Sequence, residues 1–288
     1  KVAMLVSPST SPTRNALLAE AVKAYPGLSL YSYEALEGAG ATQAREDLYG
    51  EGVLPVVSLS GIKRVLSLDS DFLGLESIGD NCQCEFSETR DVDGMGEVSR
   101  FYAVESAFTL TGGMADHRYR IAPSQILPVA ALLAKAISET IGDSALGSIA
   151  DEVIAEIVAP VYHEKWIKEC AIDLAENLGG SIVLAGGRQG REVHVLVAAI
   201  NKALGAYEKH ISLVEHDLPK LGEIAELSEA ISAGEVETLF VLNAGDVVYD
   251  APADLEFGKL LDLVSNVVHL GYSAVSYTHL RAHETSTY

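Results

Sequence analysis

Residues 101–126 read FYAVESAFTLTGGMADHRYRIAPSQI, and this stretch is the starting point for predicting the fold. It opens with four apolar residues, is broken by Gly112 and Gly113, and reaches Pro123 and Ser124 directly before a long apolar segment. A short apolar run bounded by turn residues predicts a buried strand. The stretch therefore predicts one strand, a glycine turn and the loop that opens the next helix.

Strand-like and helix-like patterns alternate on both sides of this stretch. We expect strands at residues 2–7, 28–33, 64–69, 101–104, 181–185, 211–214, 238–242 and near 267–270. We expect helices at residues 12–24, 125–140, 151–178 with a break near Pro160, 191–204 and 221–233. Such alternation is typical of mainly parallel sheets that are covered on both faces.

The fold class that follows is α/β, with two doubly wound lobes. The first lobe is expected at residues 1–145, and a helical connection followed by the second lobe at residues 146–274. Residues 74–97 are polar and too long for an ordinary connection, so we expect an exposed loop there. Residues 275–288 have neither helical nor strand periodicity and resemble a translated sequencing adapter, so we expect a tail without function that makes few core contacts.

Charge and hydropathy exclude several classes of partner. The 288 residues carry 41 acidic and 20 basic side chains, a formal net charge of −21, which repels the phosphate backbone of nucleic acids. No uninterrupted apolar run reaches the roughly 18 residues that a bilayer-spanning helix needs. The apolar run near the N-terminus is too short for a signal peptide, so we expect an internal fragment of a longer protein.

Chemistry is expected where parallel strands end, because open parallel sheets bind ligands beyond their carboxyl ends. Every predicted strand end is polar: Ser7-Pro8-Ser9, Asp69-Ser70-Asp71, Glu105-Ser106, Gly186-Gly187-Arg188 and Asn243-Ala244-Gly245-Asp246. The glycines at residues 186–190 would let backbone N–H groups approach an anion, with Arg188 adding charge. Their spacing does not match the dinucleotide fingerprint, and glycines that only permit a tight turn are the alternative.

The cysteines argue against a redox centre in this chain. Cys82, Cys84 and Cys170 are the only three, and a cluster held by four thiolates needs one more. We therefore expect no iron–sulfur cluster and no metal site.

Residues 101–126 resemble the molybdopterin-oxidoreductase family. In that family a strand ends in an acidic residue, a Thr-rich loop follows, and an Ala-Asp segment leads into the helix at the pterin cleft, as Ala115 and Asp116 do here. The amino-acid sequences of residues 105–118 and 249–254 are similar to those of the large iron–sulfur subunit of alternative complex III, a quinol-oxidising respiratory assembly. Residues 64–71, 181–188 and 235–254 resemble further blocks, so the likeness covers roughly residues 1–274.

This resemblance implies a cofactor-binding cleft, which we expect to be vestigial. The expected lining residues are Asp69, Ser70, Glu105, Ser106, Thr109, Gln125, Gly186, Gly187, Arg188 and Asn243. The family's Asp-Pro-Arg-x-Thr signature reads Glu105-Ser106-Ala107-Phe108-Thr109 here, so the proline and a cation for the pyrophosphate are missing. Gln125 lies where the family has the acid that pairs with guanine. Asp71, Glu105 and Asp246 would raise the electrostatic cost of holding phosphates.

The resemblance implies a scaffold without its own cofactor, within a membrane-attached respiratory complex on the periplasmic face of a bacterium. The molybdopterin guanine dinucleotide of the family would be absent, and iron–sulfur clusters would lie elsewhere in the whole subunit. Its partners would be the other subunits of the complex. Two alternatives stay open: a genuine molybdopterin-guanine-dinucleotide oxidoreductase, and a soluble protein that binds NAD or a nucleotide sugar at residues 186–190.

Overall fold

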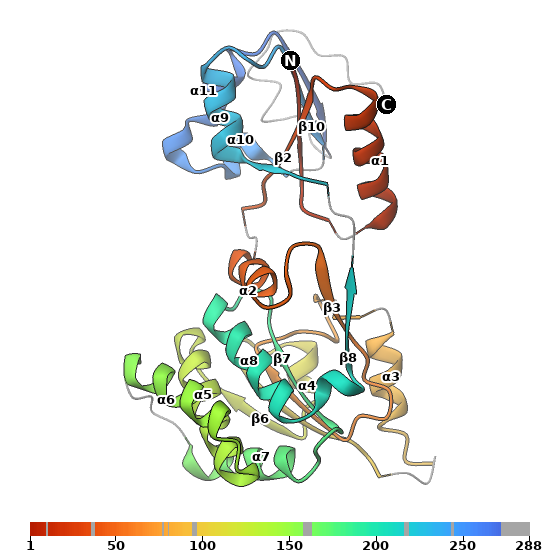
Figure 1. Ribbon diagram of the computed structural model, residues 1–288, viewed down its shortest axis with the longest axis vertical. Coiled ribbons are helices and arrows are strands. Elements are labelled where there is room, and N and C mark those ends of the chain that lie inside the picture. The colour runs from red at the N-terminus through yellow and green to blue at the C-terminus, as the bar shows by residue number, and fades with distance from the viewer. Residues whose placement is uncertain are drawn as a thin grey trace. The chain divides into compact units, whose positions relative to one another are not determined.

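The computed structural model describes residues 1–9, 11–35, 38–76, 78–79, 81–93, 97–157, 163–215, 219–242 and 245–271. The described residues form two compact units (Figure 1). Unit 1 draws on both Lys1–Glu37 and His216–Tyr288, and unit 2 is Gly38–Glu215. Both units are α/β, as the alternating pattern predicts.

Unit 1 is built on a parallel sheet with helices on both faces. Its strand order is β11-β10-β1-β2-β9, and all pairs are parallel. Leu5 and Val241 pack with Leu227 on one face, and Val6 packs with Leu18 and Leu28 on the other. The elements are β1 (Val2–Val6), α1 (Pro12–Ala24), β2 (Leu28–Ser32), β9 (Gly222–Glu223), α9 (Ile224–Ser232), β10 (Thr238–Leu242), α10 (Val247–Asp250), α11 (Phe257–Leu261) and β11 (Asn266–Leu270).

Unit 2 contains a four-stranded parallel sheet and a separate antiparallel pair. The parallel order is β6-β5-β4-β7, and β3 pairs with β8 in the antiparallel ribbon. The elements are α2 (Ala39–Tyr49), β3 (Val53–Val57), β4 (Arg64–Leu68), α3 (Cys82–Glu88), β5 (Arg100–Glu105), α4 (Leu110–Gly113), β6 (His117–Arg120), the 3₁₀ turn η1 (Pro123–Gln125), α5 (Ile126–Ile141), α6 (Ser144–Glu156), α7 (Glu164–Ala175), β7 (Ser181–Ala185), α8 (Arg191–Ala203), η2 (Ala206–Glu208) and β8 (Ile211–Glu215).

Two cores cover the two faces of the unit 2 parallel sheet. Leu66 and Leu68 of β4 lie in the core formed with α5, α6, α7 and α8. Val65 faces the other way and packs with Phe86 of α3 and Phe101 of β5. Figure 1 shows these helices on opposite sides of the sheet. All five residues of β4 are buried, as is typical of a strand covered on both faces.

The two units divide the chain differently from the lobes expected at residues 1–145 and 146–274. The expected boundary falls in the first turn of α6, a helix that packs against α5 inside unit 2. β7, which was assigned to the second lobe, pairs along its length with β4. Strand pairing over more than a hundred residues leaves no local mark in the sequence, which is why composition placed the boundary wrongly.

Residues 74–97, expected as an exposed loop, contain the helix α3. Its Cys82 and Phe86 are four residues apart, so both lie on one helix face, and both are buried. The Phe86 ring meets Phe72 and Phe101 edge to face, with centroids 5.6 and 5.4 Å apart. The helix α3 is therefore part of the unit 2 core.

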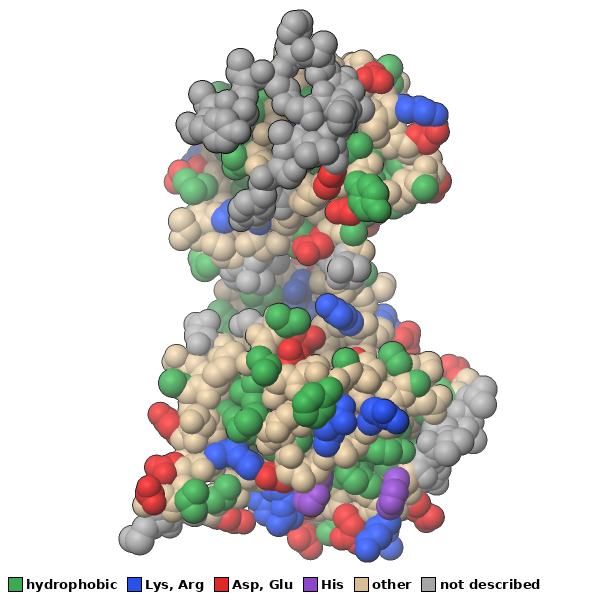
Figure 2. Space-filling model, turned by 180° about the vertical axis from the view of Figure 1, so that it is seen from behind, with side chains coloured by type: hydrophobic (Ala, Val, Ile, Leu, Met, Phe, Trp, Pro, Cys, Tyr) green, Lys and Arg blue, Asp and Glu red, His purple; other side chains and the backbone are tan. Residues whose placement is uncertain are grey.

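The surface of the described residues carries charges of both signs. On the face that Figure 2 shows, Lys and Arg side chains are interspersed with Asp and Glu side chains. Among the helices that are described, none is long and apolar enough to cross a bilayer. The tail expected at residues 275–288 lies outside the described residues.

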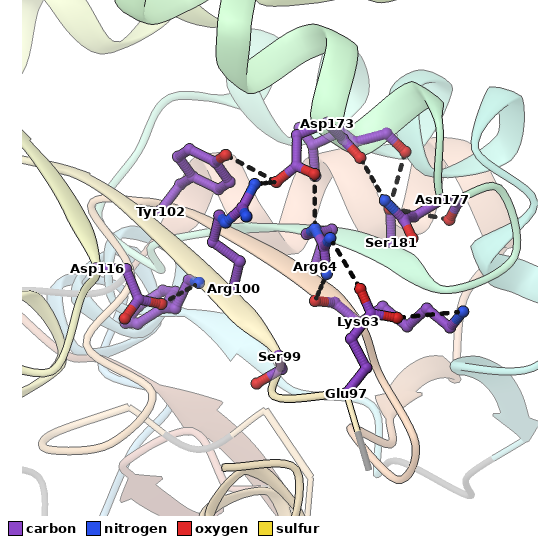
Figure 3. A network of polar contacts seen from close by, with 12 residues as sticks. Lys63, Arg64, Glu97, Ser99, Arg100, Tyr102, Asp116, Asp173, Asn177 and Ser181 are labelled. Atoms are coloured by element: carbon purple, nitrogen blue, oxygen red, sulfur yellow. Dashed lines mark hydrogen bonds and ion pairs between the residues drawn. The ribbon is translucent and has the colours of Figure 1, made fainter. Parts of the chain in front are cut away.

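A buried ion network lies at the amino ends of the unit 2 strands (Figure 3). Asp173 of α7 accepts hydrogen bonds from Arg64 Nε at 2.7 Å, Arg100 Nη1 at 2.9 Å and the Tyr102 hydroxyl at 2.7 Å. Burial alone would raise the pKa of the Asp173 carboxyl, but hydrogen bonds from Arg64 and Tyr102 and the nearby positive charges outweigh it. That pKa therefore lies below its usual value.

Asp116, the acid of the family-like Ala-Asp segment, also has a structural role at this edge. Its carboxylate accepts two hydrogen bonds from Arg90, both at 2.7 Å, and one from the Phe101 amide at 2.8 Å. The contact fixes the turn after α3 to the start of β5. Arg90 lowers the pKa of the Asp116 carboxyl.

Asp173→Ala is expected to lower the free energy of unfolding by about 3 kcal/mol, because it removes the nearest carboxylate from the buried Arg64 charge, which keeps only the longer contact to Glu97 at 3.3 Å. Chemical denaturation at neutral pH measures this. Asp151→Ala removes an exposed pair with Lys135 and is the control, expected to leave stability nearly unchanged.

The same network predicts a pH dependence. Because the folded pKa of Asp173 is depressed, its contribution is present above the unfolded carboxyl pKa of about 3.9 and is lost as pH falls through the lower folded value. The wild-type chain should lose more stability than Asp173→Asn on acidification below about pH 4. Equal losses would show that Asp173 is not held in its charged form.

Candidate functional site

The carboxyl ends of β4, β5 and β7 meet at one edge of the unit 2 sheet. From β4 the chain continues to β5 and β6 on one side, while β7 pairs with β4 on the other. The edge between β4 and β7 is thus a topological switch point, the place where open parallel sheets bind ligands. The predicted residues Asp69, Ser70, Glu105, Ser106, Gly186 and Gly187 all lie directly at or after these three strand ends.

Asp69 joins the ends of β4, β5 and β7. Its Oδ1 accepts hydrogen bonds from the Ser106 amide at 2.9 Å and the Ser106 hydroxyl at 3.1 Å. Its Oδ2 accepts from Gln189 Nε2 at 2.8 Å. Asp69 has a φ of 58°, in the left-handed region that non-glycine residues rarely adopt but Asp tolerates. The backbone turns sharply here, and the carboxylate binds the donors of the two neighbouring strand ends.

Glu76 contacts the glycine turn after β7. Its Oε1 accepts a hydrogen bond from the Gly187 amide at 3.2 Å, and its Oε2 accepts from the Ser70 hydroxyl at 3.0 Å. Burial raises the pKa of the Glu76 carboxyl and outweighs these hydrogen bonds, which act to lower it. The Gly187 amide belongs to the glycine turn that was expected to bind an anion. In this structure it donates instead to a carboxyl group of the chain itself.

Asp71 likewise accepts a hydrogen bond from a backbone N–H group, at the start of α4. It accepts hydrogen bonds from the Thr111 amide at 3.2 Å, the Thr111 hydroxyl at 2.7 Å and the Leu75 amide at 3.1 Å. Burial acts to raise the pKa of Asp71, but these donors outweigh it and lower that pKa. Asp71 is thus a charged acceptor that fixes the Thr-rich loop.

Glu105 is buried and paired, contrary to the expectation that it would repel phosphates from an open cleft. Its carboxylate forms an ion pair with Arg118 of β6 and accepts a hydrogen bond from the Thr109 hydroxyl at 2.6 Å. The side chain of Glu105 is 4% exposed. Because Arg118 balances its charge, Glu105 adds little repulsion at the switch point.

The remaining predicted residues are scattered. Arg188 is exposed, and half-buried Gln125 ends η1 beyond β6, the strand farthest from β7. Asn243 lies outside the described residues. Ser7, expected on the same edge as Asp69 and Glu105, instead follows β1 in the sheet of unit 1. The expected cleft therefore reduces to the ends of β4, β5 and β7.

Sequence reasoning missed the partners that complete this edge, Glu76, Gln189, Thr111 and Arg118. Glu76 lies in the segment mistaken for a free loop, and no spacing signal distinguishes it from the other acids there. The Arg118–Glu105 pair follows from the parallel pairing of β5 and β6, but residues 117–120 did not stand out as a strand. Among the described residues, no three His, Cys, Asp or Glu side chains are grouped as metal ligands.

Gly186 has a packing role that explains its identity. A Cβ at this position would overlap the carbonyl oxygen of Asp69, so only glycine lets β7 continue this close to the end of β4. The neighbouring Gly187 faces open space, where a Cβ would meet no atom within 4 Å. This contrast favours the close-packing interpretation for Gly186.

Comparison with solved structures shows a shared fold. The chain is similar to acetylene hydratase from Pelobacter acetylenicus, with a TM-score of 0.58, 12% identity and 93% of this chain covered. It spans 46% of that protein's length. The formyltransferase/hydrolase complex (FhcABCD) from Methylorubrum extorquens matches with a TM-score of 0.41 and 15% identity over 97% of this chain and 77% of that one, and this supports no argument. No protein-family model and no curated protein matches the chain.

Gly186→Ala is expected to destabilise unit 2 by roughly 2–4 kcal/mol, because backbone would have to move to admit the methyl group. Gly187→Ala is the matched control, and its effect should stay within about 1 kcal/mol. Urea denaturation of the two variants measures the difference. Equal effects would contradict the close-packing role.

Glu76→Gln is expected to raise the free energy of unfolding at pH 7. The glutamine keeps one acceptor for Gly187 and can donate to the Ser70 hydroxyl, but it removes a charge whose burial is unfavourable. Since the folded pKa of Glu76 is raised, wild-type stability should fall as pH rises through it, and the variant should lack that loss. Denaturation from below the unfolded carboxyl pKa of about 4.3 up to pH 8 tests both points; a variant less stable at pH 7 would show that the charged form is required.

Proposed function

We propose that this chain is part of a molybdopterin-oxidoreductase-like subunit that has lost cofactor binding and serves as a scaffold. The subunit belongs, in this proposal, to a quinol-oxidising respiratory assembly of the alternative complex III type. It is attached to the periplasmic face of a bacterial membrane through its partner subunits. The observation that carries the proposal is the set of carboxylates that bind the donors of the β4–β7 switch point.

Two lines of support point to the molybdopterin-oxidoreductase fold. The blocks at residues 64–71, 101–126, 181–188 and 235–254 follow the family's order along the sequence. The fold is shared with acetylene hydratase, itself a molybdopterin enzyme. The assignment to alternative complex III is supported only by the amino-acid sequences of residues 105–118 and 249–254.

The residues at the switch point do not fit a dinucleotide cofactor. A pyrophosphate there would need free backbone N–H groups and cations. The Ser106 and Gly187 amides already donate to Asp69 and Glu76, and Arg118 is paired with Glu105, so the exposed Arg188 is the one cation that the glycine turn at residues 186–190 offers. A phosphate in this place would have to displace carboxylates that are covalently part of the chain, and whose negative charges would repel it.

A scaffold role needs only what these contacts supply. Asp69 connects the ends of β4, β5 and β7, and Glu76 and Asp71 fix the segment that leads from β4 toward α3. The edge that holds a ligand in related folds is held together by side chains here. The result is a rigid surface on which redox-active partners can be positioned, while electron transfer takes place in those partners.

The purified chain is expected to contain no molybdenum, no iron and no guanine dinucleotide. Losing two charge-assisted contacts weakens a ligand by roughly two to four orders of magnitude, so a cofactor should not survive purification. Metal analysis, with mass spectrometry of the supernatant after denaturation, measures this. Gln125→Asp, which restores only the guanine acceptor, should not recover the cofactor.

Other outcomes would select the alternatives. Stoichiometric molybdenum or a guanine-dinucleotide mass would establish a genuine oxidoreductase, and a bound NAD or nucleotide sugar would establish the third interpretation. The respiratory assignment is tested separately by native electrophoresis of membranes that contain the whole subunit. The band that contains the subunit should also contain quinol-oxidising activity. If that band lacks the activity, the respiratory assignment is refuted, while the fold assignment is unaffected.

A further inference from the structure

A polar pocket lies at the edge of the unit 2 sheet opposite the switch point. Three connections converge there: residues 60–63 before β4, residues 176–180 between α7 and β7, and residues 209–210 before β8. They line an open pocket with a volume of about 360 Å³. It is separate from the switch point, because β4 and β7 begin here and end there.

Backbone hydrogen bonds hold the three connections together. The carbonyl of Gly180 accepts from the amides of Lys63 at 2.8 Å and Arg64 at 3.0 Å, and the Gly179 amide donates to Leu204 at 2.7 Å. The Ser58 amide donates to the His210 carbonyl at 2.9 Å. The walls of the pocket are therefore formed by the fold itself and do not depend on a ligand.

Two lysine ammonium groups supply the charge of this pocket. A Cβ on Gly179 would lie 3.5 Å from Lys209 Nζ, and a Cβ on Gly180 would lie 3.3 Å from Lys63 Cγ, so both side chains cover this glycine turn. Within the described residues Lys209 has no ion pair, and the contact between Lys63 Nζ and Glu97 is 3.8 Å long between exposed side chains. Glu176 supplies the one carboxylate among the lining residues.

The imidazole ring of His210 forms part of the same wall. It is 5% exposed, and its Nδ1 donates to the Ser58 carbonyl at 3.1 Å, which fixes the ring. The side chains of Lys63, Lys209 and Glu176 give the pocket a positive net charge, although the whole chain carries a formal net charge of −21.

We propose that this pocket binds the phosphate group of a small anion. Lysine ammonium groups bind phosphate as point charges and do not require the planar geometry of a guanidinium. The volume is near the lower end of the range for ligand pockets, which fits inorganic phosphate or a phosphomonoester of a few carbons. Salt screens the negative charges elsewhere on the chain, because they lie farther from the pocket. The two lysines are close enough to a bound anion to attract it.

Calorimetric titration of the full chain tests the proposal, with inorganic phosphate and glycerol phosphate as separate probes in phosphate-free buffer. Lys209→Gln and Lys63→Gln should each weaken binding about tenfold or more, because each removes one charge-assisted contact. Ser60→Glu, which introduces a carboxylate into the wall, should abolish binding without altering either lysine. Lys23→Gln, an exposed lysine on α1 in unit 1, removes the same charge elsewhere and should leave the affinity unchanged.

The two probes distinguish the source of the phosphate. Tighter binding of glycerol phosphate indicates a phosphomonoester, and equal affinities indicate free phosphate. Circular dichroism confirms that each variant is folded. The proposal is overturned if the wild-type chain shows no saturable binding, or if folded Lys209→Gln and Ser60→Glu bind as tightly as the wild type.

Discussion

The arrangement of unit 2 depends on the parallel pairing of one fully buried strand, β4, with β5 on one side and β7 on the other. Because both faces and both edges of β4 are covered, its register fixes where each neighbouring strand begins and ends. Charged groups gather at its two ends. Arg64 begins the strand in the Asp173 network, and Asp69 follows it at the switch point.

The two ends differ in what their charges do. At the amino end Asp173 is surrounded by Arg64, Arg100 and Tyr102, so a buried carboxylate is stabilised by donors from two strands. At the carboxyl end the carboxylates Asp69, Asp71 and Glu76 accept from hydroxyl, amide and backbone donors instead. Those donors are of the kind that bind phosphates in related folds, so here the chain provides the anions itself.

Much of the fold could be predicted from the sequence, and the failures have physical causes. The strands of residues 2–7, 64–69, 181–185 and 238–242 were correctly expected, because a parallel strand covered on both faces is a continuous apolar run. β3 and β6 were missed: β3 contains Pro55, and β6 reads HRYR at the edge of its sheet. The division into units failed because β7 pairs with a strand more than a hundred residues earlier.

The site was predictable in position but not in composition. Strand ends alone located Asp69, Glu105 and Gly187, because parallel strands of one sheet end at the same edge. Which acids accept from which donors depends on tertiary folding, and Glu76 reaches Gly187 only because the segment after β4 folds back across the strand ends. For the same reason the charge of Glu105 was misjudged, since its partner Arg118 lies on the strand that was not foreseen.

The central claim is that the chain's own carboxylates bind the anion-binding donors at the β4–β7 switch point. Amide hydrogen exchange resolved by NMR at Ser106 and Gly187, with and without guanosine diphosphate, tests it most directly. Both amides should be protected in the free chain, and their exchange and chemical shifts should not respond to the nucleotide. Rapid exchange in the free chain, or a saturable response of Gly187 to guanosine diphosphate, would contradict the account.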